Sequence, residues 1–358
     1  MFAESARAIR RVASIHRILA LLAAALAMQG FAQAQGAGSS SGSLYGKHGV
    51  TPDGVRQGIL GSCYFHSSIA ALAKAAPDTL RNAISRNPMG GYQVHFSTGP
   101  DEAVFPEDIE YGRAHNFDRS DGDWVLVLMR GYAQRAVRKG LADAIQRSDA
   151  MPAYAKPVAL EWLDHSGLLL VAYDRAIRSV VGQDGSMDEA AFKRALTSQL
   201  SARGIPDAES TMLIGFLDNE RFFDRLAYFV QRDGEVFGAY KALGQGGIPV
   251  RVIEAFMGSA HALMVADHQM TMDCLHRLHR DNTAMVAGSW SRAPADLADA
   301  NWWVSAHAYT VLDYDEDSQT VVMRNPWGTH PDPNGLFTLP LATFLEGFES
   351  ASFSDAPY

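Results

Sequence analysis

The segment around Cys63 combines residue types that could perform nucleophilic thiol chemistry. It reads Gln57-Gly-Ile-Leu-Gly-Ser-Cys-Tyr, and the small apolar residues that follow predict a buried helix over about 63–76. Free N–H groups and the dipole at a helix N-terminus favour a thiolate, so we expect the pKa of Cys63 to be depressed. Gly58 and Gly61 would allow the tight approach that exposes the thiol, and the Gln57 carboxamide could join the Cys63 N–H as an oxyanion donor. The segment therefore predicts a nucleophilic cysteine.

A base for this thiol and an orienting group for that base occur in the last third of the chain. His307 lies in the alternating segment SAHAYTVLDY, and Asn325 ends the next predicted strand, in VVMRNPWG. Two adjacent strands can bring His307 within hydrogen-bond reach of Asn325, whose carboxamide would fix the imidazole tautomer. Trp327 could shield that hydrogen bond from water. We predict that His307 is the base and Asn325 its orienter.

The cysteines and two of the tryptophans also have structural interpretations, as a disulfide or as core residues. In an oxidising compartment Cys63 and Cys274, the chain's two cysteines, could form a disulfide. The segment TMDCLHRL, however, predicts a helix in which Cys274 is a small core residue. Trp302 and Trp303 are likewise interpreted as core or subdomain-contact residues rather than substrate platforms.

Other histidines need to be separated from the candidate base. The tetrapeptide Ser-Ala-His-Ala occurs twice, and we favour His307 over His261 because only the second copy is predicted to lead into a strand followed by Asn-Pro-Trp-Gly. His66 forms only a Cys-x-x-His pair, which is weak evidence for a metal. His276 and His279 could ligate zinc, but their spacing is more typical of the polar face of a helix.

The predicted elements change in type along the chain. Helical patterns cover about 63–76, 78–86, a segment from Asp123 to Gly140, a segment opened by a capping box at Ser186–Glu189 and stopped by Gly204 and Pro206, and 212–229. Strand patterns cover 91–97 with 103–105 as a partner, then 283–290, 303–315, 320–327 and 335–341. Helical signals come first and strand signals last, which predicts an α+β protein with two subdomains.

The N-terminus has the pattern of a secretory signal peptide. Four arginines precede the eleven-residue apolar run Ile18–Met28, and Phe-Ala-Gln-Ala at 31–34 offers a cleavage site. We expect a signal peptide over 1–34, a flexible linker over 35–47, and export to the periplasm or the exterior. The apolar run is shorter than the roughly 20 residues of a membrane-spanning helix, so no span is expected after cleavage.

The net charge restricts the partners. It is −9 for the 358-residue chain and becomes −12 without residues 1–34, which carry four arginines and one glutamate. Binding to nucleic acid requires a basic face, so we expect no nucleic-acid partner. A protein or peptide substrate is expected instead, and the oligomeric state stays open.

The motifs together resemble the catalytic core of calpain-type cysteine proteases, which are related to papain. The resemblance is carried by Gln-Gly-x-Leu-Gly-x-Cys with a following aromatic residue, His-Ala-Tyr, and Arg-Asn-Pro-Trp-Gly. The segments WVLVLMRGYA (124–133), AYKALGQGGIPVRVIEAFMG (239–258) and GLFTLPLATFLEGF support it. It covers about 48–133 and 239–353.

The resemblance implies a two-lobed, papain-like core of the α+β class. A helical subdomain over 48–133 plus 239–258 would carry Cys63, and a β-rich subdomain over 259–358 would carry His307 and Asn325. In the family, the nucleophile, base, orienter and oxyanion donor match Cys63, His307, Asn325 and Gln57. Residues 134–238 separate two motifs that lie close together in the family, so we interpret them as a helical insertion acting as a lid, an exosite or a self-inhibiting element.

Several positions depart from the family pattern. Ser62 stands where calpains usually have Asp, Tyr64 replaces the usual Trp, and Met129-Arg130-Gly131 replaces an acidic-basic pair. No EF-hand loop occurs, so calcium dependence stays open and the sequence requires no cofactor. The acidic stretch Asp313–Asp317 could bind a cation, but it is more typical of a solvated hairpin loop.

The predicted function is that of a cysteine endopeptidase. Two alternatives remain. The same Cys–His–Asn chemistry supports acyl transfer, as transamidation or deamidation, and a protease core can also serve as an inactive binding protein.

Overall fold

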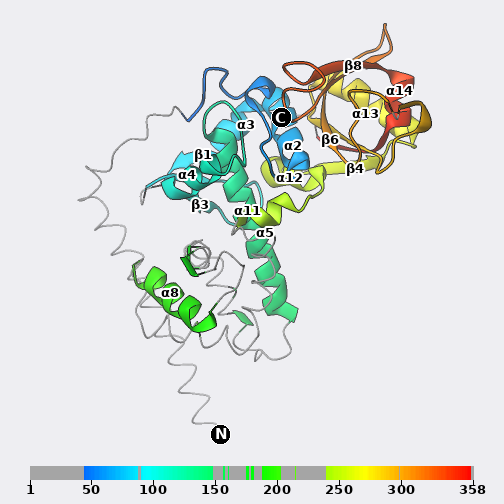
Figure 1. Ribbon diagram of the computed structural model, residues 1–358. Helices are drawn as coiled ribbons and strands as arrows, with labels where there is room; N and C mark the ends of the chain where they lie inside the picture. The colour runs from blue at the N-terminus through cyan, green and yellow to red at the C-terminus, as the bar shows by residue number, and fades with distance from the viewer. Residues whose placement is uncertain are drawn as a thin grey trace.

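The computed structural model describes residues 44–87, 90–147, 156–157, 160, 175–176, 179–180, 188–202, 214, 239–297 and 299–355. Over these residues the chain is an α+β protein, as predicted, and its strands form one three-stranded and one six-stranded antiparallel sheet. Two hydrophobic clusters accompany this division, one among the helices and one on the larger sheet. The two parts are visible in Figure 1.

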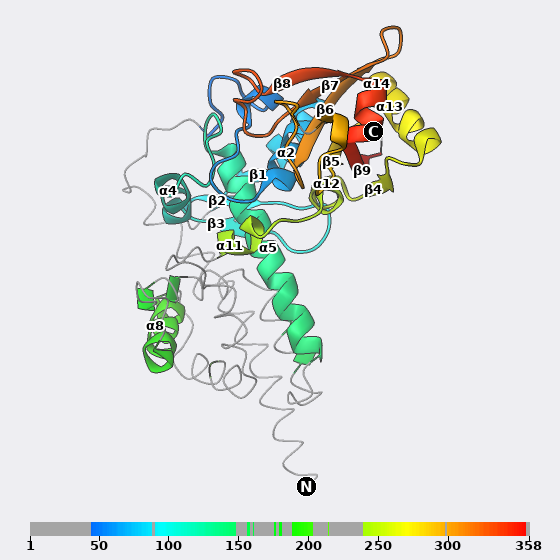
Figure 2. The same cartoon turned by 45° about the vertical axis from the view of Figure 1, so that its right-hand side comes forward.

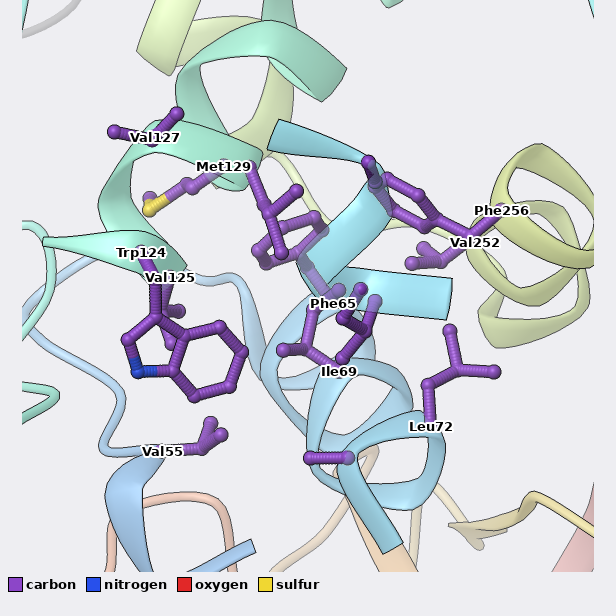
Figure 3. Packing of buried hydrophobic residues seen from close by; sticks show 14 of the residues in the cluster. Val55, Phe65, Ile69, Leu72, Trp124, Val125, Val127, Met129, Val252 and Phe256 are labelled. Atoms are coloured by element: carbon purple, nitrogen blue, oxygen red, sulfur yellow. The ribbon is translucent and has the colours of Figure 1, made fainter. Parts of the chain in front are cut away.

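The helical cluster is built around α2 (Cys63–Ala75), whose residues after Cys63 are nearly all buried. Figure 3 shows Phe65 and Leu72 of α2 among Met129 of α5 (Trp124–Arg147) and Phe256 of α12 (Pro249–Met257). Small side chains at 70, 71 and 73 let these neighbours approach closely. The helix ends before Pro77, which opens α3 (Pro77–Asn82). A central buried helix therefore holds Cys63 at its first position.

A small sheet borders this helical cluster. Its strands are β1 (Ile84–Arg86), β2 (Tyr92–Val94) and β3 (Glu102–Val104), in the order β1-β2-β3. Gly131 of α5 lies against β2, and a Cβ atom there would meet the Val94 side chain at 2.7 Å. The remaining elements here are η1 (Pro52–Gly54), α4 (Pro106–Ala114) and α11 (Ala239–Gly244).

The larger sheet has the strand order β4-β9-β5-β6-β7-β8. Its strands are β4 (Ala260–Met264), β5 (Met285–Ser289), β6 (Ala308–Asp315), β7 (Thr320–Arg324), β8 (Leu336–Pro340) and β9 (Phe348–Ser354). Helices α13 (His268–Asp281) and α14 (Leu341–Gly347) lie beside the sheet in Figure 2, and η2 (Ala295–Leu297) is a single turn. The predicted Trp302 packing is confirmed, because its ring stacks near Phe337 and Phe348.

Hydrogen bonds join α2 to β6. Ser67 Oγ, one turn after Cys63, donates to the Ala308 carbonyl at 2.8 Å, and Thr310 Oγ1 donates to the Ser67 carbonyl at 3.0 Å. Both bonds are buried, so they are protected from competition with water. They fix the start of α2 relative to the start of β6.

Several predicted boundaries are wrong. The helix predicted over 78–86 ends at Asn82 and gives way to β1, because Ile84–Arg86 pair with β2. The helix expected to stop at Gly140 continues to Arg147, since one glycine costs a helix only about 1 kcal/mol. The boundary of the insertion at 133/134 therefore falls inside α5.

The N-terminal cap of α8 (Glu189–Ser201) also differs from the prediction. The Asp188 carboxylate accepts hydrogen bonds from the backbone N–H groups of Ala190 and Ala191, so Asp188 is the cap rather than Ser186. Ser186 itself, the stop at Gly204 and Pro206, the signal peptide over 1–34 and most of the helix predicted over 212–229 lie outside the described residues. Within the part of the chain that is described, no helix is both long enough and apolar enough to cross a bilayer.

Candidate active site

Cys63 is the first residue of α2 and is partly buried. Burial raises the pKa of its thiol, and the backbone N–H groups of Ala308, Tyr64 and Cys63 itself lower it by less. The depressed pKa that the helix start predicted is therefore wrong for this thiol by itself, because desolvation outweighs the nearby donors. The interaction with Ala308 places the thiol beside the residue that follows His307.

His307 immediately precedes β6 and is 7% exposed. Its backbone is fixed to β5, since Ser289 N donates to the His307 carbonyl at 2.9 Å and His307 N donates to Ser289 Oγ at 3.0 Å. Burial lowers the pKa of His307 to about 4, while the hydrogen bond to Asn325 raises it slightly. The imidazole is therefore neutral at physiological pH and can accept a proton.

Asn325 directly follows β7 and holds the imidazole as predicted. His307 Nε2 lies 3.1 Å from Asn325 Oδ1, and the Trp327 backbone N–H donates to the same oxygen at 3.1 Å. The Trp327 donor identifies this atom as the oxygen, so Nε2 carries the imidazole proton. His307 Nδ1 is left with its lone pair, which is the nitrogen state that a base requires.

Trp327 covers this hydrogen bond on the outside. Its ring centroid lies 5.0 Å from that of His307, and 37% of the residue is exposed. The prediction that Trp327 shields the His307–Asn325 bond agrees with this contact.

Gln57 is buried and tied to the Asn325 loop. Its backbone N–H donates to the Pro326 carbonyl at 2.8 Å, and Arg324 Nη2 donates to the Val55 carbonyl at 2.6 Å, two residues earlier. The Gln57 carboxamide donates from Nε2 to the Leu60 carbonyl at 2.6 Å. That bond uses one of the two Nε2 hydrogens, so the other can serve an acceptor beside Cys63.

The two glycines before Cys63 are required by close backbone contacts. A Cβ atom at Gly58 would meet the Asn116 carbonyl oxygen at 1.9 Å, and one at Gly61 would meet the Gly244 carbonyl oxygen at 2.7 Å. Gly61 also forms a bridge with Gln245. The glycines thus fix the course of the 57–62 loop, which the sequence interpretation explained only as exposure of the thiol.

The second cysteine does not pair with the first. Both cysteines are free, and Cys274 lies on α13 in the sheet cluster, 6% exposed. Burial raises the pKa of its thiol to about 11. The interpretation of Cys274 as a core residue is confirmed.

The other histidines have partners of their own. His261 does lie on a strand, β4, which the sequence interpretation missed, and its Nε2 lies 3.0 Å from Asp355 Oδ1. On α13, His276 and His279 contact Glu316 and Asp313 of the acidic hairpin. Within the described ranges, no three His, Cys, Asp or Glu side chains gather as a metal site would require.

Sequence reasoning missed two residues that position the site. Ser289 holds the His307 backbone, and Ser67 joins α2 to β6. Ser67 lies in a predicted helix and Ser289 in a predicted strand, and nothing local distinguishes them from other serines. Their partners lie 241 and 18 residues away in sequence, so only the fold identifies them.

The described parts of the insertion proposed over residues 134–238 lie apart from α2 and from the larger sheet. In both views α8 lies beyond α5, away from α2 and from the larger sheet (Figures 1 and 2). Arg175, also in this region, contacts Glu107 of α4. The position of α8 gives no support to a lid over Cys63, and the rest of residues 148–238 lies almost entirely outside the described residues.

Comparison with known proteins adds no relative. No protein-family profile matches this chain, and no curated protein matches its sequence. The functional interpretation therefore depends on the residues of the site and their geometry.

Proposed function

We propose that this protein is a cysteine endopeptidase in which Cys63 is the nucleophile, His307 the base and Asn325 its orienter. The observation that carries the proposal is the buried His307–Asn325 hydrogen bond, which leaves Nδ1 unprotonated, while the Cys63 thiol contacts the backbone of Ala308, the next residue in the chain. A thiol, a neutral imidazole and an orienting carboxamide are the components that acyl transfer through cysteine requires.

The first half of the reaction forms an acyl-enzyme. His307 Nδ1 takes the proton of the Cys63 thiol as Sγ attacks the peptide carbonyl carbon. The Cys63 N–H and the second hydrogen of Gln57 Nε2 bind the oxyanion that develops on the carbonyl oxygen. The tetrahedral species then loses the amine, which receives the proton from His307, and a thioester remains on Cys63.

The second half regenerates the enzyme. Water attacks the thioester carbon while His307 accepts one of its protons, and the same two donors bind the new oxyanion. Collapse releases the carboxylate product and returns the proton to Cys63. Burial favours the neutral forms of both Cys63 and His307 in the free protein.

The proposal extends to the architecture and the compartment. The helical cluster would be one lobe and the sheet cluster the other lobe of a papain-like, calpain-type core, with the substrate lying where α2 meets β6. The pattern of residues 1–34 supports export to the periplasm or the exterior.

The test is cleavage of an unfolded protein substrate, with products mapped by mass. We expect Cys63→Ala to lower the rate by more than about 10³-fold. The matched control, Cys274→Ala, removes the other thiol and is expected to retain the rate. Wild-type cleavage by the Cys63→Ala protein would refute the proposal. A mass gain of about one dalton without chain cleavage would establish deamidation instead, since an amide nitrogen is replaced by oxygen.

A further inference from the structure

A second polar network lies at the start of α2. It consists of Ser62, His66 and Asp118 and does not include Cys63. His66 Nε2 lies 3.0 Å from Asp118 Oδ1, and His66 Nδ1 lies 3.1 Å from Ser62 Oγ and 3.0 Å from the Ser62 carbonyl. The side chains of His66 and Asp118 are 0% and 3% exposed, and Ser62 is fully buried. Such burial is costly unless each polar atom has a partner, so this network has a fixed geometry.

The hydrogen positions follow from the acceptors. A carboxylate only accepts, so His66 Nε2 donates to Asp118. Nδ1 then either accepts from the Ser62 hydroxyl or, when it too carries a proton, donates to the Ser62 carbonyl. In both states His66 joins Asp118 to the residue directly before Cys63.

This network closes a ring that includes the oxyanion donor. Asp118 forms a backbone bridge with Gln57, and Ser62 N donates to the Leu60 carbonyl at 2.8 Å. The same carbonyl accepts the Gln57 carboxamide. Gln57 and the first turn of α2 are therefore connected twice, through Leu60 on one side and through Asp118 and His66 on the other.

We propose that His66 and Asp118 are positioning residues for the oxyanion site. His66 and Asp118 hold the Gln57 carboxamide and the Cys63 N–H at a fixed separation. The side-chain hydrogen bonds of this network join them to each other and to Ser62 rather than to the thiol. The inference rests on the proposed function, because the two donors act together only on an acyl-transfer oxyanion. Its geometric content, the dependence of Gln57 on His66, can be measured without activity.

Two substitutions of His66 each retain one of its two side-chain hydrogen bonds, either to Asp118 or to Ser62. His66→Gln keeps an amide near Nε2 for Asp118, and His66→Asn keeps one near Nδ1 for Ser62. We expect each to lower kcat by roughly 10- to 10²-fold with KM nearly unchanged, because small misplacement of catalytic groups is costly. Melting temperatures identify any variant that does not fold, and Asp118→Asn provides a third break in the same network.

The surface supplies a matched control. Ser85, His95 and Asp101 repeat the same three residue types, with His95 2.6 Å from Ser85 Oγ and 2.7 Å from Asp101 Oδ2, but they are solvent-exposed. His95→Gln removes a histidine with the same two kinds of partner on exchanged ring nitrogens, since Nε2 faces Ser85 and Nδ1 faces Asp101. We expect it to leave kcat and KM unchanged.

A double-mutant cycle with Gln57→Ala separates positioning from general stability. If His66 acts through Gln57, His66→Gln costs roughly 10- to 10²-fold in the wild type and little in the Gln57→Ala background. Equal losses in both backgrounds would overturn the inference while leaving the proposed function intact.

An activity-independent readout covers the case in which no cleavage occurs. The Gln57 side-chain amide resonances, assigned by their loss in Gln57→Ala, are expected to shift in His66→Gln and Asp118→Asn and to stay in place in His95→Gln. Unshifted resonances in the folded His66 and Asp118 variants would refute the inference whatever the activity.

Discussion

The same tetrapeptide, Ser-Ala-His-Ala, occurs at 259–262 and 305–308, and the fold gives its two histidines opposite surroundings. His261 lies on the edge strand β4 with its side chain 55% exposed and bound to the carboxylate of Asp355. His307 precedes the central strand β6, is 7% exposed and is bound to the carboxamide of Asn325. Identical local sequence thus produces one exposed histidine beside a carboxylate and one buried histidine beside a carboxamide.

The difference shows what a proposed catalytic histidine requires beyond a motif. A neutral amide fixes the ring without adding a charge, so burial can keep His307 unprotonated. His261 differs in both respects, because its partner Asp355 is a carboxylate and its side chain is exposed. Position in the sheet decides which surroundings each copy receives, since β4 is an edge and β6 lies between β5 and β7.

The largest difference between the two histidines is expected when each is replaced separately by glutamine. We expect His307→Gln to lower kcat/KM by about 10²–10⁴-fold, the usual contribution of a general base. The matched variant His261→Gln is expected to stay within about twofold of wild type, as measured on the same peptide substrate. Comparable losses in both variants would remove the distinction between the two copies.

Burial of His307 also predicts a pH dependence of stability. The folded-state pKa is about 4 and the unfolded value about 6.5, so the unfolded chain binds the proton first as pH falls. Stability is retained above pH 6.5 and is lost between 6.5 and 4, by about 2 kcal/mol at pH 5. In denaturant titrations at pH 7 and pH 5, His307→Gln is expected to lose about 2 kcal/mol less than wild type. An equal loss in both proteins would contradict a buried neutral imidazole.

The orienting partner gives a smaller effect. Asn325→Ala removes one hydrogen bond to His307, worth about 1 kcal/mol, and we expect a loss in kcat of about fivefold. Asp355→Ala removes the corresponding partner of His261 and is expected to leave kcat unchanged. A full loss of activity in Asn325→Ala with normal folding would mean that Asn325 does more than orient the ring.

Local sequence predicted the parts of the site that local patterns control. The small apolar run after Cys63 predicted the start of α2. Two predicted neighbouring strands, one containing His307 and the other ending at Asn325, predicted the contact between these two residues. Both inferences used only helix periodicity and strand alternation. The proposed roles of these residues stay predictions.

Long-range contacts controlled what the sequence did not predict. The strand around His261 was missed because its pairing partner, β9, lies about 90 residues later, as in the pair His261 and Phe353. His66 was considered only as a weak metal ligand, since Asp118 is 52 residues away. The pKa of Cys63 was predicted from the helix start alone, and burial reversed its direction.

The sheet order has a consequence for biosynthesis. β9 is the last strand of the described chain to be translated, yet it pairs with β4 on one side and β5 on the other. Until residues 348–354 leave the ribosome, β5 lacks one of its two neighbours, and β5 carries Ser289, which holds the His307 backbone. The Cys63 segment is therefore translated long before β5, which holds the His307 backbone through Ser289, has both of its neighbouring strands.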